Sequence, residues 1–388
     1  MEQKKTPKRR SPYQRSRRLQ GKYLGWLLLG CIALVLVLSL LTPDKDFSES
    51  ENRSLAQFPS LSDVTDGTIL TDLGGYFADQ FPGRDLWISL NLTFSRLLGQ
   101  KEASGVYLCA DDYLMQVPSA PNEAQVERNL AAVNAFSDRY PELNMVMSVA
   151  PNAVTVHADK LPANAPVRDQ AADLAILQEG LRRVKFIDVT ETMKAHSDEY
   201  LFYKTDHHWT SLGAYYAFAD IAPALHILPS VWESYTVYPV STTFEGTLSS
   251  KSGSHAALDT VEICVPNTPI DYYVSYPDGR NISSLYHRDA LNVKDHYTVF
   301  FGGNYSRVDV TTTANTGRSL LIFKDSYANC MVQFLYPYFD HITMIDPRYY
   351  YDNVDLVVKS EAITDVLFLY NLDTYLGDTS LADVLVSE

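Results

Sequence analysis

One short polar segment combines residue types that suit acid–base chemistry. It reads KTDHHWT at residues 204–210 and follows residues 200–203, which we expect to form a strand. Loops at the carboxyl ends of strands are where α/β proteins place their sites. Side chains two positions apart on an extended backbone project to one side, so Asp206 and His208 can reach the same pocket.

A second segment supplies a nucleophile. Residues 319–329, SLLIFKDSYAN, predict a buried strand that leads through a tight turn directly into a helix. Such a turn exposes the hydroxyl of Ser326 above the sheet, beside the first amides of the helix. His208 would remove the proton of Ser326 and Asp206 would hold the imidazole in one tautomer, as serine acyl transfer requires.

The same chemistry needs donors for the oxyanion. Backbone amides at Ser326 and Tyr327 would supply two of them. A third would come from Asn371, which ends an apolar strand, or from the turn Gly302-Gly303-Asn304, and we favour Asn371 because it ends a strand. The remaining residues expected to contact the oxyanion or the substrate are Trp209 and Asn329.

Simpler roles compete with this interpretation. Residues 207–209 could form a packing cluster, and Asp325 or Ser326 could merely cap the helix, which is the commonest role of either residue there. Asp206 and the two histidines could instead bind a metal ion. Adjacent histidines diverge on an extended chain and no second cluster of ligand spacing follows, which disfavours a metal site and a metal-dependent cytoplasmic phosphoesterase. We therefore expect no metal and no cofactor.

The N-terminal residues indicate where the site lies. Residues 1–22 carry a net charge of +8, so with a total of −15 the other residues carry −23. Residues 24–41 are uncharged, and their 18 residues reach the length of a transmembrane helix. The stretch is longer than a signal-peptide core and lacks a small-x-small cleavage site, so we favour an uncleaved anchor over a cleaved signal. The positive-inside rule then places the following residues outside the cytoplasm, and their acidity argues against nucleic acid as a partner.

The chain is expected to divide into four parts. Within the last part, which begins at residue 63, strands alternate with helices of 10–15 residues. This alternation predicts an α/β fold with a parallel sheet covered by helices. Residues 228–312 interrupt this alternation with no convincing helix and predict a β-rich insertion. Helical residues 69–98 are broken once, by the turn at 81–84. The parts are a basic cytoplasmic tail (1–22), a transmembrane anchor (23–42), a stalk (43–62) and an ectodomain (63–388).

The two polar segments also resemble a known family. Asp206-His207-His208-Trp209 is similar to the signature of the DHHW-motif proteins of Gram-positive bacteria, relatives of the extracytoplasmic alginate O-acetyltransferases, which have an SGNH-hydrolase-like domain. Lys324 departs from the ordinary SGNH pattern, which has the glycine of Gly-Asp-Ser there, and the spacing is Asp-x-His rather than Asp-x-x-His. Four stretches carry the resemblance: 47–53, 81–84, 205–215 and 324–329.

The resemblance implies a flavodoxin-like three-layer α/β/α fold, with Ser326 as nucleophile and His208 and Asp206 as its partners. It implies an O-acyl, usually O-acetyl, transferase or esterase that acts on cell-surface polysaccharide. The acyl donor would come from a multi-span membrane acyltransferase. Two alternatives stay open: a non-catalytic glycan-binding or scaffold protein of the same fold, and a sensor or assembly factor.

Overall fold

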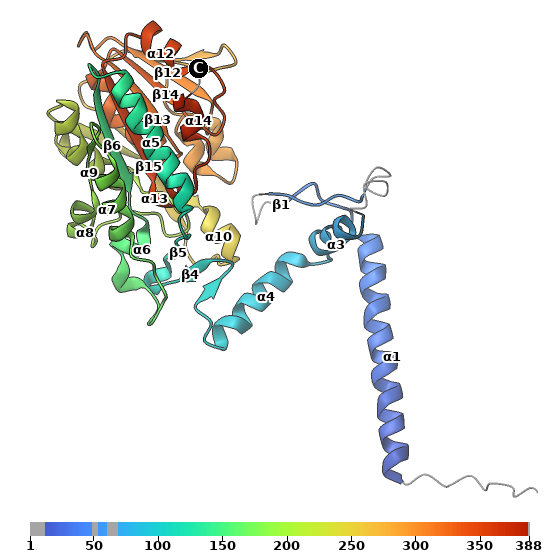
Figure 1. The fold of residues 1–388 in the computed structure, drawn as a ribbon. Helices are drawn as coiled ribbons and strands as arrows, with labels where there is room; N and C mark the ends of the chain where they lie inside the picture. Colours follow the sequence, from blue (N-terminus) through green and yellow to red (C-terminus); the bar gives the residue numbers. More distant parts are fainter. Residues whose placement is uncertain (1–11, 49–52, 60–68, 387–388) are drawn as a thin grey trace, which may run out of the picture. The chain divides into compact units, whose positions relative to one another are not determined.

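The computed structural model describes residues 12–48, 53–59 and 69–386. The chain forms two compact units, Met1–Asn91 and Leu92–Glu388 (Figure 1). The ectodomain expected from residue 63 includes described residues of both units, and no described residue before Leu92 belongs to a buried apolar cluster. The expected tail and stalk lie partly outside the described residues, at 1–11, 49–52 and 60–62.

A long apolar helix opens the N-terminal unit. Helix α1 spans Pro12–Leu41, and its segment Gln20–Leu41, with a mean hydropathy of 2.7, is long and apolar enough for a membrane anchor or a signal sequence. The gap between the two helices that follow confirms the break predicted at 81–84. The other elements are strands β1 (Phe47–Ser48) and β2 (Arg53–Ser54), which pair antiparallel, helix α3 (Ile69–Asp79) and the first part of helix α4 (Arg84–Leu97), whose residues from Leu92 belong to the C-terminal unit.

An eight-stranded mixed sheet forms the centre of the C-terminal unit (Figure 1), in the order β11-β10-β12-β14-β13-β15-β6-β7. The strands from β14 to β7 run parallel, and β10, β11 and β12 extend the sheet antiparallel. The parallel strands are β6 (Asn144–Ala150), β7 (Lys185–Phe186), β13 (Ser319–Lys324), β14 (His341–Ile345) and β15 (Asp365–Asn371); the others are β10 (Tyr272–Ser275), β11 (Asn281–Ile282) and β12 (Arg307–Thr312).

Helices cover both faces of this sheet, because successive strand residues face opposite sides. In β13, Leu320 and Ile322 join one buried cluster with residues of α9 and α11, while Leu321 and Phe323 join a second with residues of α5, α7 and α14. The predicted α/β fold with a mostly parallel sheet is thus confirmed. The helices are α5 (Glu123–Arg139), α6 (Ala153–Val156), α7 (Gln170–Gly180), α8 (Thr190–Ala195), α9 (Ser211–Ile221), α11 (Tyr327–Leu335), α12 (Val354–Ser360), α13 (Leu372–Gly377) and α14 (Leu381–Val386).

The interruption at 228–312 contributes to two sheets. Its strands β10, β11 and β12 extend the central sheet, while β8 (Tyr235–Phe244) pairs with β9 (Asp259–Pro266) in a separate antiparallel hairpin. The short helix α10 (Thr247–Ser252) lies between β8 and β9, so the expectation that this segment lacks a helix is wrong. A further antiparallel sheet, ahead of α5, consists of β3 (Glu102–Ala103), β4 (Val106–Leu108) and β5 (Leu114–Gln116).

The strand expected at residues 200–203 does not form. Phe202 makes only an isolated antiparallel bridge with Trp209. The amide of Thr210 donates to the carbonyl of Leu201 at 2.8 Å, so this backbone pairs with its own continuation rather than with a neighbouring strand. Residues 202–209 therefore form a closed loop. Contacts with other parts of the chain must hold this loop in position.

Candidate active site

The elbow between β13 and α11 presents Ser326 at the carboxyl edge of the sheet. The residues just before it are buried, whereas Ser326 itself is half-buried. Its side chain makes no capping bond to α11. Oδ1 of Asp325 accepts the amide of Tyr327 at 2.9 Å and caps the helix instead. The Ser326 hydroxyl is thereby available to another partner.

That partner is His208, which lies between Ser326 and Asp206. Its Nε2 is 2.7 Å from Oγ of Ser326, and its Nδ1 is 2.5 Å from Oδ1 of Asp206. The carboxylate can only accept, so Nδ1 carries the proton and Nε2 is left to accept the proton of the serine. The three side chains selected from the sequence therefore form one hydrogen-bonded chain in the order Ser-His-Asp.

Asp206 is held as a buried carboxylate. Its side chain is 1% exposed, and its Oδ2 accepts the amide and the hydroxyl of Thr247 at 2.7 and 2.8 Å. Burial alone would raise the pKa of this carboxyl. The charges of His207 and His208, together with hydrogen bonds, outweigh burial and hold the pKa far below its usual range. Asp206 thus stays ionised while it orients the imidazole.

Gly246 makes this arrangement sterically possible. A Cβ at Gly246 would lie 2.2 Å from the Cβ of Asp206, a separation that no two side chains tolerate. The residue directly precedes α10, whose first amide, at Thr247, is one of the donors to Asp206. The close approach of the backbone and the hydrogen bond to the carboxylate therefore depend on each other.

A second buried carboxylate, Asp259 of β9, holds the loop at its beginning. Oδ1 accepts the amide of Lys204 at 2.8 Å, and Oδ2 accepts the amide and hydroxyl of Thr205 at 2.8 and 2.5 Å. The hydroxyl of Tyr200 also donates to Oδ1. Burial raises the pKa of Asp259, and these hydrogen bonds offset part of the rise. These hydrogen bonds hold the start of the loop, which is not part of a strand, in a fixed position.

Tyr297 contacts both the histidine and the elbow. Its ring stacks on the imidazole of His208, with centroids 3.8 Å apart and planes 11° apart. Its hydroxyl donates to the carbonyl of Ser326 at 2.9 Å. One buried side chain therefore restricts rotation of the imidazole and fixes the backbone of Ser326.

Sequence reasoning missed these supporting residues, which all lie between β8 and β12. A glycine before a short helix is a local signal that could have drawn attention to the start of α10. Asp259 and Tyr297 carry no such signal, because only the tertiary fold brings them to the loop. The residues missed are Gly246, Thr247, Asp259 and Tyr297.

Two of the predicted oxyanion donors need correction. The amide of Tyr327 donates to Asp325 and is not available to a ligand. Asn371 is 3% exposed, and its side-chain nitrogen lies 3.3 Å from Oδ1 of Asn152, to which it donates. Its backbone amide donates to Oδ2 of Asp325 at 2.9 Å. Both residues therefore stabilise the elbow.

The turn at residues 302–304 is better placed than Asn371. Asn329 of α11 donates to the carbonyl of Gly303 at 3.4 Å and to Oδ1 of Asn304 at 3.1 Å, which brings the turn to the elbow. Gly302 and Gly303 have φ values of 76° and 118°, which favour glycine. Among the described residues the amide of Ser326 has no hydrogen-bond acceptor. The amides of Gly302 and Gly303 donate to the carbonyls of Thr298 and Phe300 at 2.9 and 3.5 Å. Among the described residues, the amide of Ser326 and the nitrogens of Asn304 are thus the donors that the geometry leaves for an oxyanion.

Lys324 replaces the glycine of the ordinary SGNH pattern with a buried cation. Its Nζ donates to Oδ1 of Asn304 at 2.9 Å and to Oδ1 of Asn329 at 2.8 Å, and lies 3.7 Å from Oδ2 of Asp346. Burial lowers the pKa of Lys324 to about 8, against the opposing effect of Asp346. Lys324 and the 3%-exposed Asn329 support the turn, so the prediction that Asn329 contacts substrate is not supported.

Trp209 likewise joins the loop to the elbow. It is fully buried, and its Nε1 donates to the carbonyl of Tyr327 at 3.0 Å. In the opposite direction, the hydroxyl of Tyr327 donates to the carbonyl of His207. The expectation that Trp209 contacts substrate is wrong, because its indole is enclosed between these two segments.

The same loop could offer ligands to a metal ion. Asp206, His207 and His208 place three potential ligand atoms within 4.8 Å of one another. Both ring nitrogens of His208 and both oxygens of Asp206 are already hydrogen-bonded, and Nδ1 of His207 lies 2.9 Å from Oγ1 of Thr247. A metal ion would have to break these bonds, so the donor set fits proton transfer better.

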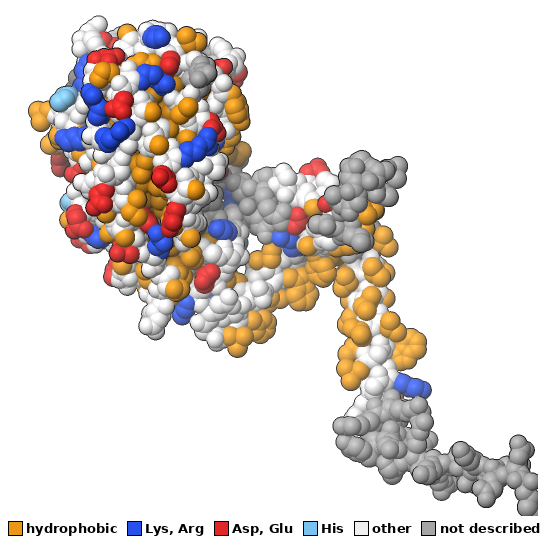
Figure 2. All heavy atoms as spheres, in the orientation of Figure 1, with side chains coloured by type: hydrophobic (Ala, Val, Ile, Leu, Met, Phe, Trp, Pro, Cys, Tyr) orange, Lys and Arg blue, Asp and Glu red, His pale blue; other side chains and the backbone are white. Residues whose placement is uncertain are grey.

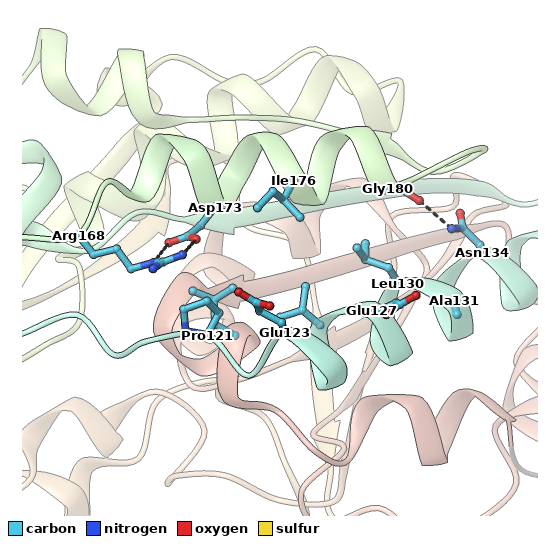
Figure 3. A pocket seen from close by; sticks show the side chains of 12 residues that line it. Pro121, Glu123, Glu127, Leu130, Ala131, Asn134, Arg168, Asp173, Ile176 and Gly180 are labelled. Carbon is cyan, nitrogen blue, oxygen red and sulfur yellow. Dashed lines mark hydrogen bonds and ion pairs between the residues drawn. The ribbon is translucent and has the colours of Figure 1, made fainter.

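A separate hollow of about 510 Å³ lies between α5 and α7 (Figure 3). Apolar side chains such as Leu130 and Ile176 line it, and at one end Arg168 pairs with Asp173 at 2.5 to 2.7 Å. No member of the Ser-His-Asp chain lines this hollow, and its lining contains no serine, cysteine or histidine. The residues suited to chemistry therefore lie elsewhere.

Two comparisons with known proteins, both with TM-scores above 0.5, agree on the fold. A DHHW family protein from Eubacterium siraeum has a TM-score of 0.65 at 23% identity, over 74% of this chain and 98% of that one. Bacillus cereus PatB1, solved with a sulfonyl adduct, has a TM-score of 0.59 at 21% identity, over 72% and 98%. The O-acetyltransferase domain of Pseudomonas putida AlgJ has a TM-score of 0.46 at 15% identity, over 73% and 99%. No curated protein matches the sequence.

A family model gives the assignment. The model described as DHHW protein matches residues 102–345, more than half of the chain. The matched region contains the loop with Asp206 and His208, the elbow with Ser326, and the strands and helices that join them. The chain belongs to the DHHW protein family.

Proposed function

We propose that the chain is an extracytoplasmic serine O-acyltransferase or esterase, of the O-acetyl class, that acts on cell-surface polysaccharide. The observation that carries the proposal is the hydrogen-bonded chain from the half-buried Ser326 through His208 to the buried Asp206. The resemblance to the SGNH-hydrolase-like O-acetyltransferases supports the reaction class. A Ser-His-Asp chain is suited to acyl transfer because it activates a weak nucleophile at neutral pH.

The reaction would proceed in two halves. Oγ of Ser326 attacks the carbonyl carbon of the acyl donor while Nε2 of His208 takes its proton, and the amide of Ser326 with Asn304 stabilises the oxyanion. The tetrahedral intermediate collapses to acyl-Ser326, and the leaving group takes the proton from His208. A sugar hydroxyl or water then attacks the ester while His208 takes its proton. The second intermediate collapses to the acylated sugar or the free acid, and His208 returns the proton to Oγ of Ser326.

The proposal includes a membrane topology. Residues 1–22 form a cytoplasmic tail, 23–42 an uncleaved anchor and 43–62 a stalk, and the ectodomain at 63–388 lies outside. A multi-span membrane acyltransferase would supply the acyl group. The charge of −23 beyond residue 22 suits a neutral glycan better than a polyanion.

Covalent labelling combined with turnover tests this function. The full chain, purified in detergent, would be treated with a sulfonyl fluoride and separately assayed for release of acetate from a small acetyl ester. We expect a single adduct on Ser326, located by mass spectrometry, and slow ester hydrolysis that Ser326→Ala lowers at least about 10³-fold. The matched control is Ser319→Ala, at the other end of β13, which should leave both readouts unchanged.

Two results would contradict the proposal. Equal hydrolysis by wild type and Ser326→Ala would exclude the serine mechanism. A folded wild-type chain with neither adduct nor turnover would favour the alternative of a non-catalytic glycan-binding or scaffold protein of the same fold.

A further inference from the structure

Helix α4 carries an apolar face that is exposed along its whole length. At 3.6 residues per turn, its exposed large apolar positions and the residue after the helix fall within about a third of the helix circumference. Figure 2 shows apolar side chains gathered along α4. The members of this α4 face, which are 38–89% exposed, are Leu86, Trp87, Leu90, Phe94, Leu97 and Leu98.

The other side of α4 has a different environment. Leu92 is only 9% exposed and packs in a small core with residues of β4, β5 and α10. Arg96, one turn further on the same side, is exposed. The helix is therefore attached to folded structure by one side. Trp87 of the α4 face lies edge-on to the ring of Phe81, and no member of the face belongs to a buried apolar cluster among the described residues. A contiguous apolar surface of this kind marks an interaction site.

We infer that the α4 face lies in the interface of the lipid bilayer from which α1 emerges. Its large aliphatic side chains with Trp87 and Phe94 are the residue types that interfacial helices insert between headgroups. Helix α1, whose segment Gln20–Leu41 can span a membrane, precedes α4 in the same chain. The inference rests on the proposed function in one respect, because α1 as the anchor brings α4 to the membrane. It can fail independently, because an anchored chain can still hold the α4 face in water.

Charge distinguishes this contact from electrostatic binding. The α4 face contains no charged residue, and the chain beyond residue 22 carries −23, which anionic lipid repels. Burial of apolar area must therefore drive the contact, so neutral lipid suffices and salt has little effect. A second copy of this chain or a membrane protein could cover the same face, but each would exclude lipid from it.

Site-directed spin labels test the inference in the full chain. All four native cysteines are free thiols, with Cys31 exposed, Cys109 intermediate and the other two buried, so the background carries Cys31→Ala and Cys109→Ser. A label at Phe94→Cys is compared with one at Arg96→Cys, on the opposite side of the helix, in phosphatidylcholine nanodiscs. Collision rates with oxygen, which partitions into lipid, and with a water-soluble nickel chelate report the surroundings of each label.

We expect the oxygen-to-nickel ratio at residue 94 to exceed that at residue 96 at least about fivefold, and to be insensitive to 0.5 M salt. Adding Leu90→Glu to the residue-94 variant should abolish the difference without altering the thermal unfolding of the folded unit. Equal ratios with free access of nickel at both labels would overturn the inference, because the face would then lie in water. Exclusion of both reagents at residue 94 would also overturn it and indicate a protein partner. Recovery of the chain with the discs separately tests the anchor.

Discussion

The loop at residues 204–210 and the elbow at 324–327 supply the two halves of the candidate site in different ways. The elbow follows from regular structure, because β13 is enclosed by β14 and β15 and leads directly into α11. The loop belongs to no strand; the carbonyl of Lys204 accepts the amide of Leu114 in β5, and the loop donates to Asp259 and accepts from Thr247, which lie far away in the sequence. The nucleophile is thus positioned by a strand and the helix that follows it, whereas the base is held in place mainly by the segment between β8 and β12.

This difference makes separate predictions for the two halves. Changes at Gly246, Thr247 or Asp259 should impair the base without disturbing the elbow, although these residues lie outside the motif, whereas Tyr297 contacts both halves. The rate of sulfonyl labelling of Ser326 and kcat for ester hydrolysis report on the site, and chemical denaturation reports on the fold.

The largest effect is expected for Asp259→Ala. The change leaves the amides of Lys204 and Thr205 and two hydroxyls without their buried acceptor, and each unsatisfied group costs about 1–3 kcal/mol. We expect the free energy of unfolding to fall by about 3 kcal/mol or more and kcat to fall at least about 10²-fold. Denaturant titration and ester hydrolysis measure the two effects. The control is Asp278→Ala, an exposed carboxylate of the same segment, which should change stability by less than about 0.5 kcal/mol. Full kcat in a folded Asp259→Ala protein would show that the loop needs no such support.

A smaller effect is expected for Gly246→Ala. The added Cβ would displace Asp206 from His208, so kcat should fall about 10²-fold while the protein remains folded. The rate of sulfonyl labelling should fall in parallel, because Ser326 loses its activated base. Gly377→Ala is the control, since no atom lies within 4 Å of its added Cβ. Unchanged labelling in Gly246→Ala would mean that Asp206 can move without consequence.

Tyr297 tests the connection between the two halves. Tyr297→Phe removes the hydrogen bond to the carbonyl of Ser326 but keeps the ring on His208, so kcat should fall by less than about tenfold. Tyr297→Leu removes both contacts and should cost more. Steady-state kinetics measure both variants, with Tyr238→Phe at an exposed position as control. Equal losses in the two variants would assign no role to the stacked ring.

The fold was largely predictable because its elements have local signatures. Apolar runs predicted β13 and β15, the tight turn after β13 predicted the start of α11, and the Pro-Gly turn at 81–84 predicted the break between α3 and α4. The expectation for residues 200–203 failed because a short apolar run has the same pattern whether it joins a sheet or closes a loop on itself. The pairing of β10, β11 and β12 with the central sheet joins segments far apart in the sequence, which no local pattern records.

The site was predictable only where sequence neighbours determine it. Ser326, His208 and Asp206 follow from two short segments and their positions next to expected elements. The amide of Tyr327 was assigned wrongly although an aspartate two residues before it is a common acceptor for such an amide. The engagement of Asn371 with Asn152 and the stacking of Tyr297 on His208 depend on tertiary packing, so spacing could not reveal them.

The position of β15 has a consequence for the stage of folding at which the site can form. This strand comes last along the sequence but lies between β13 and β6 in the sheet. While the chain is synthesised from its N-terminus, the strand that carries the nucleophile lacks this neighbour until residues 365–371 have been made. The contact between Ser326 and His208 itself spans 118 residues, and contacts over such separations form late in folding. Until residues 365–371 have been made, the sheet around β13 is incomplete, so we expect the proposed chemistry to begin only after β15 has joined it.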